Sequence, residues 1–382
     1  MFAGFEADLA AAIATGRIAG AVALVANREG IVFEAAAGLK AVGNDAKVLP
    51  DSIFWLASMT KAITSVAALQ LVETGKVGLD DDLAPLVPEF AEPQVLEGFD
   101  AGGRARLRPA RSKITLRGLL THTSGYGYGF LSPDLQRWAD QAGLSMNSGT
   151  RKDMVMPLLF DPGQDWAYGI GIDWAGLVVE ALGGQRLDAY FQDNILGPLG
   201  MIDTGFALSD DQEARRVSPH VRLPDGALMA IPFAMPKDPE VLSGGGGLYG
   251  TAADYSRFLR MVLNGGELDG VRILSPAMMA QLGDIQTGDL RAGAFKSTGT
   301  MTLDFDLFPE QRPGWGLATL VNPDPVAQGR AAGSLAWAGI FNTYYWADPT
   351  SGTAGILLAQ LTPFGDPDIL GLLNSLERAA YS

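Results

Sequence analysis

The chain has 382 residues, of which 47% are hydrophobic, so it is long enough for a large core and for roughly two to three domains. Its net charge of −15 argues against a protein that binds the phosphate backbone of nucleic acids. The sequence contains no cysteine, which excludes disulfides, thiol catalysis and cysteine-ligated metals. The two histidines, His122 and His220, lack a His-x-x-x-His spacing, so we expect no histidine-based zinc site.

The first twenty residues indicate an amphipathic helix, because Phe5, Leu9 and Ile13 recur at helical spacing. They lack the basic start and apolar core of a signal peptide. No segment of the chain approaches 18 uninterrupted apolar residues, so we expect no membrane span and a cytoplasmic protein.

The next elements are a predicted hairpin and a predicted helix. Residues 21–27 and 31–38 are apolar runs on either side of a short polar turn that contains glycine, which is typical of a β-hairpin. A strongly apolar helix begins near Ser58 and ends near Glu73, with Gly75 in the position that favours a left-handed residue. We expect residues 80–113, rich in Asp, Pro, Gly and Arg, to be mostly loop.

The sequence pattern predicts helices in the middle of the chain and mainly strands toward its end. Helices are expected at 115–122, 173–183, 187–196, 252–265 and 366–382, and strands at 315–321, 334–339, 342–348 and 354–361. We therefore expect the two ends of the chain, 1–57 and 285–382, to form one α/β lobe. Residues 58–284 would form a largely helical lobe, with the functional site between the two.

Ser58 is followed by Lys61 one helical turn later. Residues three apart share a helix face, so the lysine amine can reach the serine oxygen. In a desolvated pocket, or near other cations, the pKa of a lysine falls and its neutral amine can accept a proton. The alternative is a serine that caps the helix beside a solvated lysine. The apolar helix favours a chemical role for Lys61, because such a helix is expected to be buried and lysine is rarely buried without a specific role.

Two further segments contain candidate catalytic groups. Tyr168 lies in a glycine-rich turn before a helix, and an adjacent ammonium would lower the pKa of its phenol and make it a base. Residues 337–339, Trp-Ala-Gly, lie in a predicted strand whose edge could offer a backbone N–H to an oxyanion. Each segment taken alone is also consistent with ordinary packing. The run 244–247 of four glycines marks a close backbone approach or a tight loop.

Taken together, these segments resemble the serine hydrolases of the class C β-lactamase and penicillin-binding-protein superfamily. The resemblance extends from about Phe5 to the C-terminal helix. Further supporting phrases are 119-LLTHTSGYGYG-129, 162-PGQDWAYGIGIDWAGLVVE-180, 195-ILGPLGMIDTGF-206 and 244-GGGGLYGTAADYSRFLRMVLNGG-266. The last phrase and 336-AWAGIFNTYYWADP-349 are most similar to the family VIII carboxylesterases. The resemblance implies an α/β (α+β) fold of β-lactamase type, with an antiparallel sheet flanked by the N- and C-terminal helices and a largely helical inserted lobe.

The resemblance also implies a role for each matching residue. Ser58 resembles the acylated nucleophile, and Lys61 resembles the helper base that keeps a tyrosine ionised. Tyr168 matches the tyrosine of the Tyr-x-Asn motif, acting as base toward the serine and then as acid toward the leaving alcohol. Trp337 to Gly339 align with the Lys-Thr-Gly strand of the β-lactamases. By that alignment the oxyanion donors are the backbone N–H groups of Ser58 and Ile340.

Departures from the β-lactamase motifs favour an ester as substrate. Ile170 replaces the asparagine of Tyr-x-Asn, and Trp337 replaces the lysine of Lys-Thr-Gly, so the groups that would hold a β-lactam are missing. Asn342 stands where many relatives have glycine. We expect His122 to belong to a structural turn and not to a triad, and His220 to be a surface residue.

The sequence therefore predicts a serine carboxylesterase for a small-molecule ester, with no cofactor and no nucleic-acid or membrane partner. It leaves open whether the protein is a monomer or a homodimer. The residues expected to line the substrate site are Gly339, Ile170, Tyr126, Tyr128, Phe130, Trp166 and Trp337. Three alternatives remain: an amide hydrolase or weak β-lactamase, an acyltransferase, and a non-catalytic penicillin-recognising protein. Retention of the candidate nucleophile and base speaks against the last.

Overall fold

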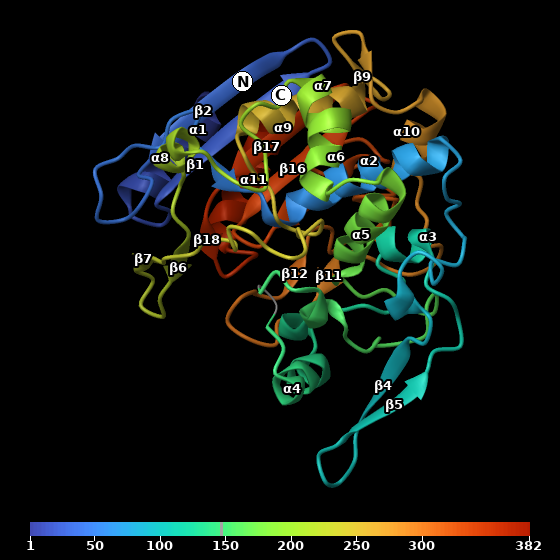
Figure 1. The fold of residues 1–382 in the computed structure, drawn as a ribbon. Helices are drawn as coiled ribbons and strands as arrows, with labels where there is room; N and C mark the ends of the chain where they lie inside the picture. Colours follow the sequence, from blue (N-terminus) through green and yellow to red (C-terminus); the bar gives the residue numbers. More distant parts are fainter. Residues whose placement is uncertain (146–147) are drawn as a thin grey trace.

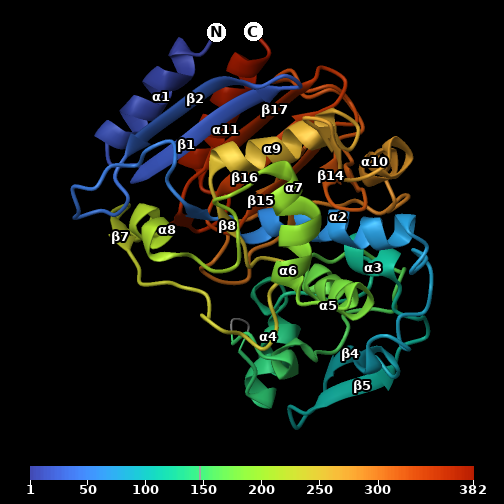
Figure 2. The same ribbon diagram turned by 45° about the horizontal axis from the view of Figure 1, so that its top comes forward.

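The computed structural model describes residues 1–145 and 148–382. Its largest sheet has seven strands in the order β13-β14-β15-β16-β17-β1-β2, and every neighbouring pair is antiparallel. The strands are β1 (Gly20–Asn27), β2 (Ile31–Gly38), β13 (Gly314–Trp315), β14 (Leu320–Val321), β15 (Leu335–Gly339), β16 (Thr343–Asp348) and β17 (Thr353–Leu358). The pairing of β1 with β17 joins the two ends of the chain in one sheet, as Figures 1 and 2 show.

Helices cover the sheet on both faces. The central strands β1, β16 and β17 are buried at almost every position, which requires cover on both sides of the pleat. Helices α1 (Ala3–Ala14) and α11 (Pro367–Ala380) pack on each other, and α1 also contacts β2 while α11 contacts β17. Helix α9 (Ala252–Leu263) packs on β1, β16 and β17 and lies across the sheet in Figure 2. Residues 252–263 therefore pack with the sheet, although the sequence assigned them to the helical lobe.

Helix α2 (Thr60–Glu73) connects the sheet to the helical part of the molecule. It follows β3 (Phe54–Trp55) and the 3-10 turn η1 (Ala57–Met59), and it packs on α5 (Gly171–Gly183). Helix α2 is buried from Thr60 to Leu69, so both the sheet side and the helical side cover it. The predicted end is confirmed, because the helix stops at Glu73 and Gly75 has a φ of 72°.

The remaining helical elements belong mostly to the second part of the molecule. They are η2 (Pro88–Phe90), α3 (Leu116–Leu120), η3 (Gly129–Leu131), α4 (Pro133–Ala142), η4 (Arg151–Met154), α6 (Leu187–Phe191), the π-helical turn η5 (Gln192–Leu196), α7 (Gly197–Leu199), α8 (Asp210–Arg215) and α10 (Pro276–Gly283). The predicted helices at 115–122, 173–183, 187–196 and 252–265 therefore all exist, with slightly different ends.

The other strands form small sheets at the edges of the molecule. They are β4 (Gln94–Phe99), β5 (Ala105–Pro109), β6 (His220–Arg222), β7 (Leu228–Ala230), β8 (Tyr249–Gly250), β9 (Glu267–Leu268), β10 (Val271–Arg272), β11 (Ala294–Phe295), β12 (Phe305–Asp306) and β18 (Leu361–Thr362). The expectation that 80–113 is mostly loop misses the β4–β5 hairpin, which projects from the body in Figure 1. Of its strand residues only the neighbours Val95 and Leu96 are buried, so no apolar alternation marks the strands.

No helix in the described ranges 1–145 and 148–382 is long and apolar enough to cross a bilayer. Within the same ranges, no three or more histidine or acidic side chains gather in a way that could hold a metal ion.

Candidate active site

Ser58 lies in η1, at the point where the chain passes from the sheet into helix α2. Its side chain does not cap the helix: the residue before α2 is Met59, and no side-chain cap is formed there. Ala57 has a φ of 48°, a conformation that is unfavourable for alanine and is found mainly where surrounding structure enforces it. This strained conformation of Ala57 turns Ser58 away from the strand and toward a cavity, which Ser58 lines.

The ammonium group of Lys61 is completely buried and has three acceptors around it. Its Nζ lies 3.1 Å from Ser58 Oγ, 3.0 Å from the Tyr128 hydroxyl and 2.6 Å from the carbonyl oxygen of Gly245. A lysine ammonium has three protons to donate, so all three are used. The arrangement suits a charged lysine that holds the serine oxygen in place.

Electrostatics in the pocket keep Lys61 protonated. Burial alone lowers the pKa of a lysine, but the interactions of Lys61 with Tyr128, Tyr168 and Asp173 outweigh the burial, so the pKa of Lys61 is raised above its usual value. The expectation that a lowered pKa would leave Lys61 neutral is therefore wrong. The physical reason is that acidic groups, and no second cation, surround its amine.

The glycine run beside Lys61 forms a close backbone contact with the start of α2, as the sequence predicted. The carbonyl of Gly244 accepts a hydrogen bond of 2.5 Å from Thr64 Oγ1, and the carbonyl of Gly246 accepts one of 2.6 Å from the indole of Trp55. A Cβ on Gly245 would lie 2.2 Å from a carboxylate oxygen of Asp173, so a larger residue there would displace the carboxylate.

Tyr168 also lies beside the Lys61 ammonium. The Lys61 Nζ lies 4.9 Å from the centre of the Tyr168 ring, and the Tyr168 hydroxyl accepts a hydrogen bond of 2.8 Å from the indole of Trp337. Tyr128 also faces Lys61, and its hydroxyl is the one that touches the ammonium. Burial raises the pKa of Tyr128, while the positive charge of Lys61 opposes that rise. The sequence assigned Tyr128 only to the pocket wall.

The two expected oxyanion donors, Ser58 and Ile340, both line the same cavity. Strand β15 passes so close to the nucleophile segment that a Cβ on Gly339 would lie 2.5 Å from the carbonyl oxygen of Leu56. The hydroxyl of Thr343, on the neighbouring strand, donates a hydrogen bond of 3.2 Å to the same carbonyl. Glycine at 339 thus permits the approach that brings the two backbone segments together.

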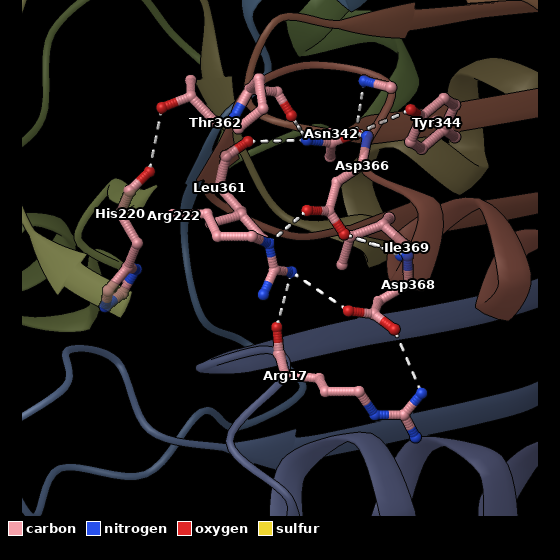
Figure 3. A network of polar contacts seen from close by, with 12 residues as sticks. Arg17, His220, Arg222, Asn342, Tyr344, Leu361, Thr362, Asp366, Asp368 and Ile369 are labelled. Carbon is pink, nitrogen blue, oxygen red and sulfur yellow. Dashed lines mark hydrogen bonds and ion pairs between the residues drawn. The ribbon is translucent and has the colours of Figure 1, made fainter. Parts of the chain in front are cut away.

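Asn342 lies in the turn after β15, and its hydrogen bonds connect this turn to residues 361–366, which include a second part of the cavity wall. It is fully buried with a φ of 59°, a conformation that asparagine tolerates better than most residues. Its side-chain amide donates to the carbonyls of Leu361 (2.7 Å) and Pro363 (2.9 Å). Its oxygen accepts from the Tyr344 hydroxyl at 2.8 Å and from the backbone N–H groups of residues 365 and 366 at 3.0 and 3.2 Å, as Figure 3 shows. This network explains why asparagine, and not glycine, stands at this position.

The cavity has a volume of about 700 Å³ and is lined largely by apolar and aromatic side chains. Of the residues expected at the substrate site, those that line it are Tyr128, Phe130, Tyr168, Ile170, Trp337, Gly339 and Ile340. Tyr126 and Trp166 do not line it. Tyr126 packs on Phe90 and Trp174 behind the wall, and Trp166 packs on His122 and Trp315. Each is adjacent in sequence to a lining segment but faces the other way.

His122 is buried in the turn that supports Tyr168, as expected for a structural residue. Its Nδ1 accepts a hydrogen bond of 3.5 Å from the N–H of Gly169, and its ring lies 4.7 Å from the Tyr168 ring. Burial, assisted by the charge of Lys61, lowers the pKa of His122 well below its usual value. The imidazole is therefore neutral, and it packs against Tyr168.

The expectation that His220 is a surface residue is wrong. His220 is 1% exposed and starts β6, which pairs with β18 at the edge of the cavity. Its Nε2 accepts a hydrogen bond from the N–H of Val42 at 3.1 Å, and its Nδ1 lies 3.2 Å from the carbonyl oxygen of Gln360. Its partners are backbone groups far away in sequence, so no local pattern could reveal the burial.

Two groups of site residues escaped the sequence analysis. Asp173 is 8% exposed and accepts hydrogen bonds from Ser243 Oγ (2.6 Å) and the N–H of Gly245 (2.9 Å). Trp55, Phe233 and Phe341 form an aromatic wall, in which the first two rings are stacked with centres 4.5 Å apart. The only available signal for Asp173 was a carboxylate in an otherwise apolar helix.

Comparison with known proteins agrees with this geometry. Monacolin J acid methylbutanoyltransferase of Aspergillus terreus is 34% identical over 86% of this chain and 81% of its own length. Lovastatin esterase of Penicillium rubens is 33% identical over 96% of this chain and 95% of its own. The unliganded structure of simvastatin synthase (LovD) from Aspergillus terreus, as its selenomethionyl derivative, superposes with a TM-score of 0.84 and 30% identity, covering 99% of this chain and 97% of that one.

By name, these relatives are a methylbutanoyltransferase, an esterase and a synthase. The model of the Beta-lactamase family matches residues 5–379, which is nearly the whole chain. The architecture of a helix-covered antiparallel sheet and an inserted helical part is the one that the resemblance implied. The chain therefore belongs to the Beta-lactamase family and has the β-lactamase-like fold.

Proposed function

We propose that the protein is a serine carboxylesterase of the family VIII type, acting through an acyl-enzyme on Ser58. The observation that carries this proposal is the hydrogen bond of 3.1 Å between Ser58 Oγ and a fully buried Lys61, at the wall of an apolar cavity. A buried ammonium directed at a serine oxygen has no evident structural purpose, whereas it orients a nucleophile and stabilises a neighbouring phenolate.

In the proposed acylation step, the Tyr168 phenolate takes the proton of the Ser58 hydroxyl while Oγ attacks the ester carbonyl carbon. The carbonyl oxygen becomes an oxyanion, which the N–H groups of Ser58 and Ile340 would stabilise. As the intermediate collapses, the bond to the alcohol oxygen breaks and Tyr168 returns the proton to that oxygen. Lys61 stays charged throughout, which favours the phenolate electrostatically.

In the proposed deacylation step, water gives a proton to Tyr168 and its oxygen attacks the acyl carbon. The bond to Ser58 Oγ then breaks, and Tyr168 returns the proton to the serine. The carboxylic acid leaves and the resting enzyme is restored. Tyr128 is the second candidate for the base, since its hydroxyl touches Lys61 directly at 3.0 Å. Tyr168→Phe and Tyr128→Phe separate the two, because only loss of the base should lower kcat by several orders of magnitude.

The cavity supports an uncharged ester of medium size as substrate. Beside the nucleophile the wall presents Trp337 where β-lactamases have a lysine, so no cation there would hold a carboxylate. A space of about 700 Å³ lies in the range of small-molecule sites and accommodates both halves of such an ester.

Acyl transfer is a second candidate function, favoured by the name of the methylbutanoyltransferase relative. An alcohol would replace water in the deacylation step, and its acyl ester would be the product. The two functions share every residue named above, so product analysis in the presence of a long-chain alcohol distinguishes them: a new ester indicates transfer, and free acid alone indicates hydrolysis. Turnover of a chromogenic cephalosporin would instead support the amide-hydrolase or weak β-lactamase alternative.

The test of the proposed function is hydrolysis of p-nitrophenyl esters from acetate to octanoate by the wild type and by Ser58→Ala. We expect activity in the wild type and none above background in the variant. Equal activity in both proteins would refute the proposal. Absence of activity in both the wild type and Ser58→Ala would favour an acyltransferase, an amide hydrolase or a binding protein.

A further inference from the structure

Asp173 is a buried carboxylate for which the proposed reaction has no stated use. It is the third residue of helix α5, five positions after Tyr168, and it lines the cavity. Its Oδ1 accepts hydrogen bonds from Ser243 Oγ at 2.6 Å and from the N–H of Gly245 at 2.9 Å. A buried carboxylate carries a desolvation penalty unless opposite charge and hydrogen bonds offset it.

The opposite charge is Lys61, and the Gly245 residue links the two. The N–H of Gly245 donates to Asp173, and the carbonyl of the same residue accepts a hydrogen bond of 2.6 Å from the Lys61 ammonium. The N–H therefore faces the negative charge and the carbonyl faces the positive one, so each hydrogen bond has its favourable polarity. In a cavity of low dielectric, such a chain of bonds is strengthened by the charges at both ends.

We propose that Asp173 is a positioning residue of this active site: through Gly245 it holds the Lys61 ammonium against Ser58 and keeps it charged. The inference rests on the proposed function, since it gives the carboxylate a purpose in that reaction. Two observations support it independently. Asp173 is among the groups that raise the pKa of Lys61, and Asp173 lies so close to residue 245 that an added Cβ would displace its carboxylate.

Four titratable groups surround Lys61. Tyr128 and Tyr168 face it from the helical part, Asp173 from α5, and His122 from the turn that supports Tyr168. His122 is neutral, and one of the two tyrosines, Tyr168 or in the alternative Tyr128, exchanges a proton in the proposed reaction. Asp173 exchanges none in any proposed step, so its removal should weaken the hold on the lysine proton.

Asp254 offers a matched control. It is also the third residue of a helix, α9, and also buried at 7% exposure. It also accepts two hydrogen bonds from outside its helix, from the N–H of Asp203 (2.7 Å) and from Thr204 Oγ1 (2.9 Å). Asp254 does not line the cavity and does not act on Lys61. Asp173→Asn and Asp254→Asn therefore remove the same charge from two similar positions.

The first experiment measures coupling without relying on catalysis. Melting temperatures are compared for the wild type, Asp173→Asn, Lys61→Met and the double variant. If Asp173 is paired with the lysine, Asp173→Asn leaves a buried ammonium uncompensated, and adding Lys61→Met recovers part of the lost melting temperature. The proposal fails if the decreases in melting temperature of the two single variants simply add in the double variant. It also fails if the double variant melts at the same temperature as Asp173→Asn. In either case the carboxylate contributes only to the stability of the fold.

The second experiment measures kcat and KM of the same single variants from pH 6 to pH 10 on ethyl butanoate, which resists spontaneous hydrolysis. We expect Asp173→Asn to lower kcat about tenfold or more, with KM within about threefold, because the lost interaction acts in the transition state. On the alkaline side of the pH profile, the activity of Asp173→Asn should begin to fall at a lower pH than that of the wild type. Asp254→Asn should retain the wild-type profile. A profile of Asp173→Asn that superimposes on the wild type would overturn the inference. Activity that persists in Ser58→Ala would instead refute the proposed function, and the melting experiment would still decide the role of Asp173.

Discussion

The indole N–H of Trp337 donates a hydrogen bond of 2.8 Å to the hydroxyl oxygen of Tyr168. Both side chains are buried, and they come from segments of the chain about 170 residues apart. A donor aimed at a phenol oxygen favours the ionised phenolate over the neutral phenol. In this protein a neutral indole thus occupies the place where β-lactamases have a lysine, and it supports the proposed base without adding a charge that would attract an acidic substrate.

Replacing Trp337 by phenylalanine tests this relationship. The substitution keeps an aromatic ring but removes the N–H, so we expect kcat to fall about tenfold or more, since a hydrogen bond to a charged group contributes about 1.5–3 kcal/mol. Trp346→Phe is the control, because Trp346 donates a similar bond of 3.2 Å to the hydroxyl of Tyr381 away from the cavity. Equal kcat values for Trp337→Phe and the wild type on a p-nitrophenyl ester would contradict the role of the indole.

The network around Asn342 predicts a joint effect on stability and rate. Asn342→Gly permits the φ of 59° but removes the amide that holds residues 361–366, so we expect a loss of about 2–4 kcal/mol in the free energy of unfolding. Because the same turn presents the N–H of Ile340, kcat should also fall, by about tenfold. Urea unfolding and ester kinetics measure the two effects.

Asp269→Gly is the control for that experiment, because Asp269 is another non-glycine residue with positive φ, at 50°, in the turn between β9 and β10. We expect it to change stability by less than about 1 kcal/mol and to leave kcat unchanged. If Asn342→Gly behaves like this control, the turn does not depend on the amide network.

His220 predicts a pH-dependent contribution to stability. Burial lowers the pKa of His220, despite opposing hydrogen bonds to the backbone, so the folded protein holds it neutral while the unfolded chain takes up a proton below about pH 6.5. The contribution of His220 to the free energy of unfolding is therefore complete above that pH and is lost progressively as the pH falls. In urea unfolding, the stability difference between wild type and His220→Gln should be smaller at pH 5.5 than at pH 7.5. A difference independent of pH would show that the histidine does not titrate on unfolding.

The aromatic wall predicts a change in substrate preference. Phe233 lines the cavity against Trp55, so Phe233→Ala enlarges that side and should shift the preferred p-nitrophenyl ester toward longer acyl chains or larger alcohols. Tyr126→Ala should lower stability by about 3–5 kcal/mol, as for other large buried aromatic side chains, without changing the preference, because Tyr126 packs behind the wall. A preference altered by Tyr126→Ala and unaffected by Phe233→Ala would place the substrate elsewhere.

The sequence predicted those parts of the site that depend on local geometry. Ser58 and Lys61 meet because they are one helical turn apart, and the end of α2 follows from Gly75. Strands β1, β2, β15, β16 and β17 were predictable because their apolar runs lie between turn residues. The expectation of one strand at 315–321 is wrong, because the chain turns within this run and forms two short antiparallel strands, β13 and β14. The motif resemblance added Tyr168 and Trp337, which spacing alone could not bring to Ser58.

What the sequence missed depends on contacts between distant segments. Tyr126 and Tyr128 are two residues apart in a glycine-rich loop, and only the packing of that loop decides that the second faces Lys61. The pKa of Lys61 is raised by Tyr128, Tyr168 and Asp173, and the link to Asp173 appears only when Gly245 is placed between the two residues. The burial of His220 results from its contacts with Val42 and Gln360.

The central claim is that Ser58 becomes acylated, and the most direct test is the mass of the intact protein during turnover. After mixing with p-nitrophenyl butyrate and rapid acid quenching, the account predicts a fraction of the protein heavier by one butyryl group. Peptide mapping should locate that group on the peptide that contains Ser58, and Ser58→Ala should carry none. An ester-hydrolysing protein whose adduct maps to another residue, or persists in Ser58→Ala, would contradict the account.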